Sequence, residues 1–281
     1  MRRILSSIYM LVVLFTVLIT TPNAFASTPI VKICDDEGEW PPYVFFDRND
    51  IKNPSPTIGG ITVEIFYTIF SEANIPMKIV PLPWKRCLKE TEDFQKYKKY
   101  EVFNNGNINE WREKNFLRTH ALYQTRVGYF YDSRRFPNGL EIKTLKELSQ
   151  YTICGVAGFN YEPYYQSGLT RDIDIGAHNS YQAFRKMVLG RCEVLFSAIE
   201  PILGAGNIGR LVIPKSVRYG ALNTPRTTFY SWVSKSSPRA EQIRDVINQG
   251  LDNLHNSCRY ERFFRNYLPQ GSGLPLAKGC K

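Results

Sequence analysis

The chain has 281 residues and a formal net charge of +10; 43% of its residues are hydrophobic. This length suits one large domain or two smaller lobes, each able to bury its own core. The Lys and Arg residues are dispersed and form none of the dense stripes typical of nucleic-acid binding, so we predict a solvated basic surface. The three His lie far apart and no C-x-x-C occurs, so neither a metal site nor a cofactor is predicted.

The first 26 residues predict a secretory signal peptide. Arg2 and Arg3 precede a short apolar run, and Ala24-Phe25-Ala26 gives a small-x-small cleavage pattern. An uncleaved anchor is the less favoured alternative, because a spanning helix needs roughly 20 apolar residues. We therefore expect a periplasmic protein. Its even number of Cys predicts up to three disulfides in that oxidising compartment: Cys34, Cys87, Cys154, Cys192, Cys258 and Cys280.

The first part of the mature chain alternates between predicted strands and helices. Residues 28–36 read as a buried strand, and 61–75 as an amphipathic helix with apolar residues at three- and four-residue steps. Residues 77–83 and 100–105 are predicted strands, and 84–97 a predicted helix. This alternation indicates a mostly parallel sheet flanked by helices. Ligands bind beyond the carboxyl ends of such strands, so we expect the loops at 34–40, 81–84 and 104–107 to converge.

The pattern then restarts. Strands are predicted at 125–133, 151–158 and 192–198, with helices at 144–150 and 180–191. A late strand at 227–235 precedes a helix at 237–257, which opens on Ser237-Pro238. A last helix is expected at 258–268. The sequence thus predicts a second α/β unit.

Several stretches together resemble a known family. They are Glu39-Trp40-Pro41-Pro42-Tyr43, "GGITVEIF", Trp84, the turn leading to Arg112, "ICGVAGFNY", "GRCEVLFS" and the ending "VSKSSPRAEQIRDVINQGLDNL". The chain resembles bacterial extracellular solute-binding protein family 3, the periplasmic polar amino acid-binding proteins of ABC importers. The resemblance implies an α/β, two-lobe periplasmic-binding-protein-like fold of type II. Each lobe would be a mostly parallel sheet flanked by helices. Lobe one would comprise 28–124 plus 228–281 and lobe two 125–227, joined by two crossing strands.

The resemblance also implies where a ligand sits. Arg112 aligns with the carboxylate-binding Arg, whose planar guanidinium can donate two parallel hydrogen bonds. Asn104, Asn105 and Asn107 fall where further donors are expected from the same turn. Trp40 and Trp84 align with aromatic residues that sandwich the ligand. The alternatives are a surface Arg at a helix start and tryptophans that only fill the core.

Lobe two would add Asn160, in place of the usual Thr or Ser, in the turn "GVAGFNY". Glu39 or Glu37 in the first loop would select the ligand's side chain, with Asp35 and Asp36 as competing candidates. The Asp that holds an α-ammonium in family members is replaced here by Ala198. Either Glu200 substitutes for it, or the ligand is not an ordinary α-amino acid. Glu193 matches a strand residue that usually faces away.

The implied topology makes Cys154 and Cys192 neighbours, and it pairs Cys34 with Cys87 and Cys258 with Cys280. The resulting function is a monomeric receptor that passes a small carboxylate-bearing solute to an inner-membrane ABC permease. A membrane sensor is the alternative partner. A dehydratase-like enzyme on this fold is a third alternative, with Glu200, Glu193 or His178 as acid or base. No nucleophile–base spacing supports it, so we predict no enzymatic activity.

Overall fold

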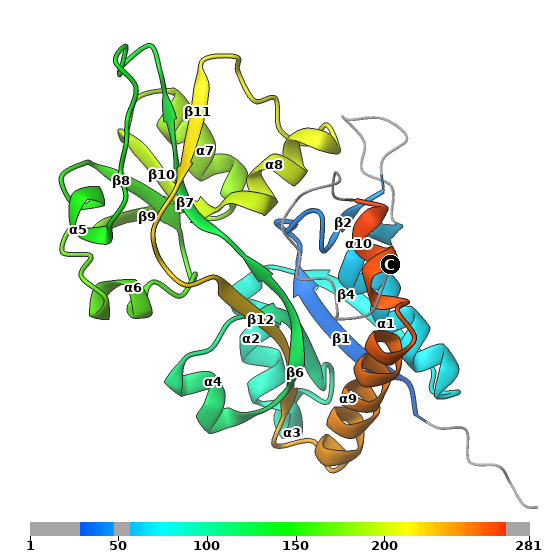
Figure 1. Cartoon of the computed structure of the whole chain (residues 1–281). Helices are drawn as coiled ribbons and strands as arrows, with labels where there is room; N and C mark the ends of the chain where they lie inside the picture. Colours follow the sequence, from blue (N-terminus) through cyan, green and yellow to red (C-terminus); the bar gives the residue numbers. More distant parts are fainter. Residues whose placement is uncertain (1–28, 48–56, 268–281) are drawn as a thin grey trace, which may run out of the picture.

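The structure is a computed structural model that describes residues 29–47 and 57–267 (Figure 1). The predicted signal peptide lies outside the described residues. Two five-stranded sheets form the framework, and each carries its own helices. We call the two sheets with their helices lobe one and lobe two. The molecule has the type II periplasmic-binding-protein-like architecture, which confirms the predicted fold class.

The sheet of lobe one has the strand order β4-β1-β5-β12-β6. Strand β1 is parallel to β4 and β5, whereas β12 is antiparallel to β5 and β6. In this order the strands are β4 (Met77–Leu82), β1 (Val31–Asp36), β5 (Val102–Gly106), β12 (Thr227–Ser234) and β6 (Phe116–Thr125). A two-stranded pair lies beside this sheet, β2 (Phe45–Phe46) with β3 (Ile58–Gly59).

Helices cover both faces of this sheet. Along β1, Ile33 packs in the core beneath α1 and α9, while the next residue, Cys34, packs on the opposite face with α2. Successive side chains of a strand point to opposite faces of the sheet, so burial of both residues shows that β1 is covered on both sides. The helices are α1 (Ile61–Glu72), α2 (Trp84–Glu92), α3 (Phe94–Tyr97), α4 (Glu110–Asn115), α9 (Ala240–Asn256) and α10 (Tyr260–Arg265).

Gly60 fixes where α1 begins. Its φ of 120° is open to Gly but strained for other residues. A Cβ at this position would also lie 2.4 Å from the backbone oxygen of Tyr43. The Gly59-Gly60 pair therefore lets the loop after β1 cross closely over the start of α1, and the buried residues of α1 confirm its predicted apolar face.

The sheet of lobe two has the order β11-β7-β10-β8-β9. Strands β10, β8 and β9 run parallel, and β7 is antiparallel to β10 and β11. The strands are β7 (Val127–Asp132), β8 (Ile153–Val156), β9 (Ile173–Ala177), β10 (Val194–Ala198) and β11 (Val217–Ala221). The helices are α5 (Leu145–Leu148), α6 (Glu162–Gln166), α7 (Ser180–Val188) and α8 (Ile199–Asn207). Of the residues that the structure describes, none forms a helix long and apolar enough to cross a membrane.

The chain crosses between the sheets twice. It leaves the first sheet at the end of β6 and enters the second at β7, with Arg126 alone between the two strands. It returns between β11 and β12 (Figure 1). The residue boundaries that the resemblance implies for the lobes stay a prediction.

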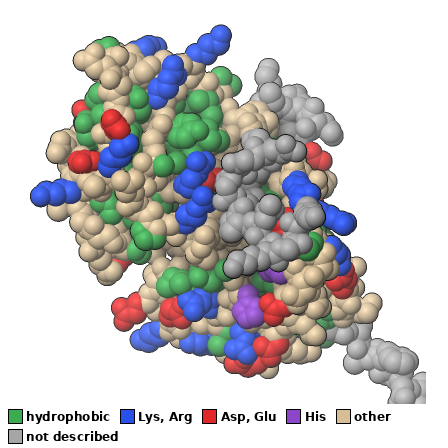
Figure 2. All heavy atoms as spheres, in the orientation of Figure 1, with side chains coloured by type: hydrophobic (Ala, Val, Ile, Leu, Met, Phe, Trp, Pro, Cys, Tyr) green, Lys and Arg blue, Asp and Glu red, His purple; other side chains and the backbone are tan. Residues whose placement is uncertain are grey.

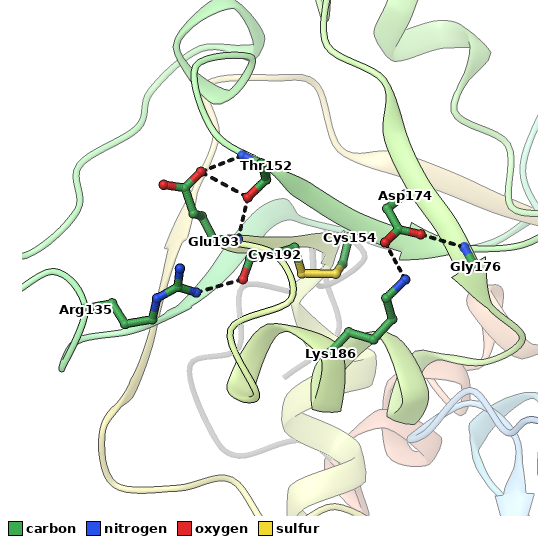
Figure 3. The surroundings of a disulfide bond; sticks show 8 residues. All are labelled: Arg135, Thr152, Cys154, Asp174, Gly176, Lys186, Cys192 and Glu193. Atoms are coloured by element: carbon green, nitrogen blue, oxygen red, sulfur yellow. Dashed lines mark hydrogen bonds and ion pairs between the residues drawn. A yellow bond between two sulfur atoms is a disulfide. The ribbon is translucent and has the colours of Figure 1, made fainter.

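Two of the predicted disulfides are present and are confirmed. Cys34 and Cys87 join β1 to α2, with their Cα atoms 5.6 Å apart. Cys154 joins β8 to Cys192, just before β10, with a Cα–Cα distance of 5.8 Å (Figure 3). Cys280, the predicted partner of Cys258, lies outside the described residues. Each bond ties a strand to a neighbouring element of the same lobe, so neither restrains movement of one lobe against the other.

Candidate functional site

A cavity of about 90 Å³ lies between the two lobes. It is bounded in lobe one by the ends of β1 and β5, by α4 and by the starts of α2 and β12. Lobe two contributes the start of β7, the end of β10, the loop that follows β8 and one residue of α6. The three loops expected to converge do so, because Trp40, Trp84 and Asn107 all line this cavity.

Arg112 is held in the cavity wall by the Asn-rich turn. Asn109 caps α4 by accepting a hydrogen bond from the backbone N–H of Arg112 at 2.8 Å. The Nη1 of Arg112 donates to the backbone oxygen and the Oδ1 of Asn107, at 2.6 and 2.5 Å. The guanidinium carbon lies 5.7 Å from the ring centre of Trp84. The turn thus orients the guanidinium but uses few of its donors.

The remaining donors of Arg112 are free to bind a ligand. Arg112 is only 3% exposed, and its Nε has no hydrogen-bond partner among the described residues. No carboxylate of those residues forms an ion pair with it. Burial lowers the pKa of its guanidinium to about 10, so it stays charged at neutral pH. A buried cation with unused donors is a site for an anion.

Two carboxyl groups line the same cavity. Asp35 is fully buried; its Oδ1 accepts from the backbone N–H of Asp36 at 2.9 Å, and its Oδ2 from Asn105 Nδ2 at 2.8 Å. Asp36 Oδ1 accepts from the backbone N–H of Gly38 at 2.8 Å. Burial is the main cause that raises the pKa of each carboxyl to about 7. Over the described parts of the chain, neither has a Lys or Arg as an ion-pair partner.

Asn105 helps to hold the carboxylate of Asp35 in place. Its φ of 59° places it in the left-handed region, which Asn tolerates better than most residues. Its amide nitrogen donates to Asp35, while its oxygen accepts from Tyr123 OH at 2.9 Å. The amide expected to help bind an anion is therefore already hydrogen-bonded at both ends. Asn104, one residue earlier, lines no part of the cavity and instead accepts from Ser231 Oγ.

The two lobes touch beside the cavity. Asn160 of lobe two donates to the backbone oxygen of Ile108 at 2.8 Å, and its amide nitrogen lies 3.5 Å from Asn107 Oδ1. The ring of Phe159 meets Trp40 edge-on, with ring centres 5.4 Å apart. Trp40 also packs in the core of lobe one, so this residue belongs to the core and lines the cavity at the same time.

Two predicted site residues lie outside the cavity lining. The Oε2 of Glu39 accepts from Arg210 Nε of lobe two at 2.7 Å. Glu200 accepts from the backbone N–H and the Nε of Arg126, at 2.9 and 2.8 Å. Each carboxylate is therefore paired across or at the junction of the lobes, whereas Ala198 does line the cavity.

Glu193 and His178 also lie away from the lining. The side chain of Glu193 accepts from the backbone N–H of Thr152 at 2.7 Å, beside the disulfide of lobe two (Figure 3). Within the described residues, no group of three or more His, Cys, Asp and Glu side chains is placed to hold a metal ion. On the face shown in Figure 2, Lys and Arg side chains lie scattered over both lobes.

Sequence reasoning missed several lining residues near the crossings between the lobes. Thr125 and Val127 flank the first crossing, and Thr227 and Phe229 follow the second. Thr125 is fully buried, and its hydroxyl has no partner in the described part of the chain. The signal that could have found them is the predicted position of the crossings, because strands that join two lobes form the floor of the space between them.

No protein-family model and no curated protein matches this sequence. Solved structures do match its fold. A histidine kinase sensor domain similar to periplasmic binding proteins is 15% identical, with a TM-score of 0.70 over 88% of this chain and 98% of its own. An amino acid ABC transporter substrate-binding protein from Streptococcus pneumoniae, bound to L-arginine, is 11% identical, with a TM-score of 0.69 over 85% and 94%.

An ancestral amino acid-binding protein, described as a precursor of cyclohexadienyl dehydratase, is 13% identical. Its TM-score is 0.66, over 85% of this chain and 96% of its own. At these identities the likeness shows the fold alone.

Proposed function

We propose that this protein is a periplasmic solute receptor that captures a small carboxylate-bearing solute between its lobes for an inner-membrane ABC permease. The observation that carries the proposal is Arg112, a buried guanidinium in the inter-lobe cavity with unused donors and no ion pair among the described residues. A planar carboxylate matches two of its N–H groups at once. Hydrogen bonds to charged groups contribute about 1.5–3 kcal/mol each, enough to decide which solutes bind.

The surrounding side chains support binding rather than a purely structural role. Trp40 and Trp84 both line the cavity and offer aromatic faces to the rest of the solute. Asn107 and Asn160 lie on opposite lobes and already meet beside the cavity. We infer that the lobes close over the solute and bury it, so that water does not compete for the guanidinium.

Export of the protein and its membrane partner are supported by different observations from those on the cavity. The first 26 residues read as a signal peptide, and the two disulfides fit an oxidising compartment. Amino acid ABC transporter proteins and a sensor domain share the fold, so a membrane sensor is the alternative partner. We propose a monomer, since one chain supplies both walls of the cavity.

The direct test is mass spectrometry of small molecules released when the purified protein is denatured. We expect one dominant compound, with a carboxylate, in an amount comparable to that of the protein. Recovery of only compounds without an acidic group would contradict the proposal. So would the absence of any released compound, together with no binding of carboxylates in calorimetric titrations.

An enzymatic role is the second candidate, and one observation favours it. Asp35 and Asp36 line the cavity with pKa values raised by burial to about 7, which suits proton transfer at neutral pH. Incubating the protein with the released solute separates the roles. A receptor returns the solute unchanged, whereas an enzyme converts it with turnover that Asp36→Asn abolishes.

A further inference from the structure

Lobe one supplies all the charged side chains among the described residues that line the cavity. They are Asp35, Asp36 and Arg112. The wall from lobe two is neutral and largely aromatic, with Phe159, Tyr161, Tyr164 and Phe196 beside Asn160 and Ser197. Any charge on a bound solute must therefore be matched by lobe one.

The positive and negative parts of this wall are separate. Among the described residues, no nitrogen of Arg112 lies within 4.0 Å, the ion-pair distance, of a carboxylate oxygen, and its Nη1 donates to Asn107 instead. A solute that satisfies both parts needs its own opposite charges at separate positions.

The two carboxylates are built to receive a cation. Asp35 is held by the backbone N–H of Asp36 and by Asn105, and Asp36 by the backbone N–H of Gly38. None of these partners carries a positive charge. Burying a carboxylate without a counter-charge is costly, and the raised pKa values of the pair reflect that cost.

A second observation also points to a polar ligand. Thr125 lines the cavity, is fully buried, and its hydroxyl has no hydrogen-bond partner in the described residues. Buried hydroxyls normally find a partner. A ligand group that donates or accepts a hydrogen bond would supply one, because the Thr125 hydroxyl can do both.

The cavity volume limits the size of the ligand. A water molecule needs about 10–15 Å³ of cavity measured in this way. The volume of about 90 Å³ found here is several times that minimum, so the cavity suits a small solute rather than a large one.

We propose that the solute is a compact ω-amino carboxylate, with its carboxylate on Arg112 and its terminal ammonium on Asp35 and Asp36. An α-amino group would lie next to the carboxylate, where lobe two presents no acidic side chain in the cavity lining. The inference rests on the proposed function, because it assumes that the cavity binds a carboxylate. It adds the second charge, its position and the length of the molecule.

Four five-carbon carboxylates test this inference by calorimetric titration: pentanoate, 2-aminopentanoate, 5-aminopentanoate and 2,5-diaminopentanoate. We expect 5-aminopentanoate to bind at least tenfold more tightly than pentanoate and 2-aminopentanoate. Adding the second amino group, as in 2,5-diaminopentanoate, should change that affinity by less than about threefold. Tighter binding of 2-aminopentanoate than of 5-aminopentanoate would overturn the inference.

Single substitutions test which carboxylate binds the terminal ammonium. Asp36→Asn should lower the affinity for 5-aminopentanoate to that for pentanoate, while the affinity for pentanoate itself changes little. Glu37→Gln is the matched control, since it removes one negative charge from an exposed position of the same loop. An unchanged preference in Asp36→Asn, with a melting temperature no lower than that of the wild type, would remove the assigned cation site.

The inference and the proposed function can fail separately. If denaturation releases a carboxylate without a terminal cation, and none of the amino-pentanoates binds, the receptor function stands and the ω-amino assignment falls. If no solute is released and none of the four compounds binds, both fall. Binding of 5-aminopentanoate that is lost in Asp36→Asn supports both.

Discussion

Burial of Asp36 is destabilising when no cation is present, and this gives a prediction at the scale of one residue. Its folded-state pKa is about 7 against an ordinary value of 3.8. Well below pH 3.8 the carboxyl is protonated in both states. As the pH rises from 4 to 7 the unfolded state ionises first, so folding stability falls across this range.

Asp36→Asn should therefore raise the melting temperature at pH 8 and have almost no effect at about pH 2.5, where the carboxyl is protonated in both states. The gain should reach at least about 1 kcal/mol, or roughly 2–4 °C for a chain of this size. Thermal melts of ligand-free wild type and variant across this range provide the test. If the melting temperatures of variant and wild type differ by the same amount at both pH values, Asp36 does not titrate as described. Glu37→Gln should change the melting temperature little at either pH, because the Glu37 side chain is exposed.

Sequence reasoning predicted ligand contacts for Arg112 and the two tryptophans, all of which line the cavity, but left open the choice among the four acidic residues of the first loop. The choice depends on partners far away in the chain. Glu39 reaches Arg210, 171 residues on, and so lies outside the cavity lining. Asp35 is held in it by Asn105, 70 residues on. No local pattern encodes such contacts.

The inter-lobe contact of Glu39 supports a prediction at the scale of elements. Its carboxylate accepts a hydrogen bond from Arg210 Nε at 2.7 Å. The Arg210 guanidinium carbon lies 4.3 Å from the ring centre of Tyr181. The Glu39 side chain is 2% exposed and that of Arg210 is 38% exposed, so the pair is shielded from water on its carboxylate side only. It joins the loop after β1 to lobe two and should favour the closed arrangement.

Arg210→Gln should therefore shift ligand-free protein toward open forms and weaken solute binding several-fold without changing which solute is preferred. Single-molecule distance measurements between labels on the two lobes report the open fraction. Arg218→Gln is a suitable control, because Arg218 lies on β11 of the same lobe and, among the described residues, donates to the nearby backbone oxygens of Lys215 and Val217. Equal open fractions in Arg210→Gln and wild type would mean that the pair does not hold the lobes together.

The disulfide of lobe two supports a second prediction at this scale. Cys154 and Cys192 tie β8 to the segment before β10 (Figure 3). Replacing both by Ser should lower the free energy of unfolding by about 2–4 kcal/mol, chiefly by freeing the unfolded chain. Denaturant unfolding measures the loss. Solute affinity should be almost unchanged because neither Cys lines the cavity, and a large loss of affinity at unchanged stability would contradict this.

Elements with a clean period were predicted well, and irregular ones were not. The apolar face of α1 recurs at helical spacing and is buried as expected. Strand β6 was missed because its pairing with β12 shifts register twice, which breaks the simple alternation of buried and exposed residues. The predicted helix at 84–97 is interrupted at Asp93, where α2 ends and α3 begins.

At the scale of the whole molecule, the two crossings allow the lobes to move as bodies. The described disulfides lie within single lobes. The contacts of Phe159 with Trp40, and of Asn160 with Ile108, must break when the cleft opens. We therefore expect a smaller radius of gyration with bound solute than after its removal. Small-angle scattering of both forms tests this, and identical profiles would contradict hinge closure.

The two-lobe topology could be predicted because strands and helices alternate twice along the chain and because the resemblance supplies the connections. The cavity's charge arrangement could not, since it depends on side chains that meet only after both sheets form. Ala198 marked the absence of one acidic group in the sequence. Only the structure shows Asp35 and Asp36 lining the cavity together with Arg112.

Titration of Arg112 variants with the solute released from the wild type tests the central claim most directly. Arg112→Ala should weaken binding at least tenfold. Arg112→Lys should be nearly as damaging, because Lys keeps the charge but lacks the planar pair of donors. Arg118→Ala is the control, since Arg118 is 40% exposed and pairs with Glu113. Unchanged affinity in Arg112→Ala, at an unchanged melting temperature, would contradict the account.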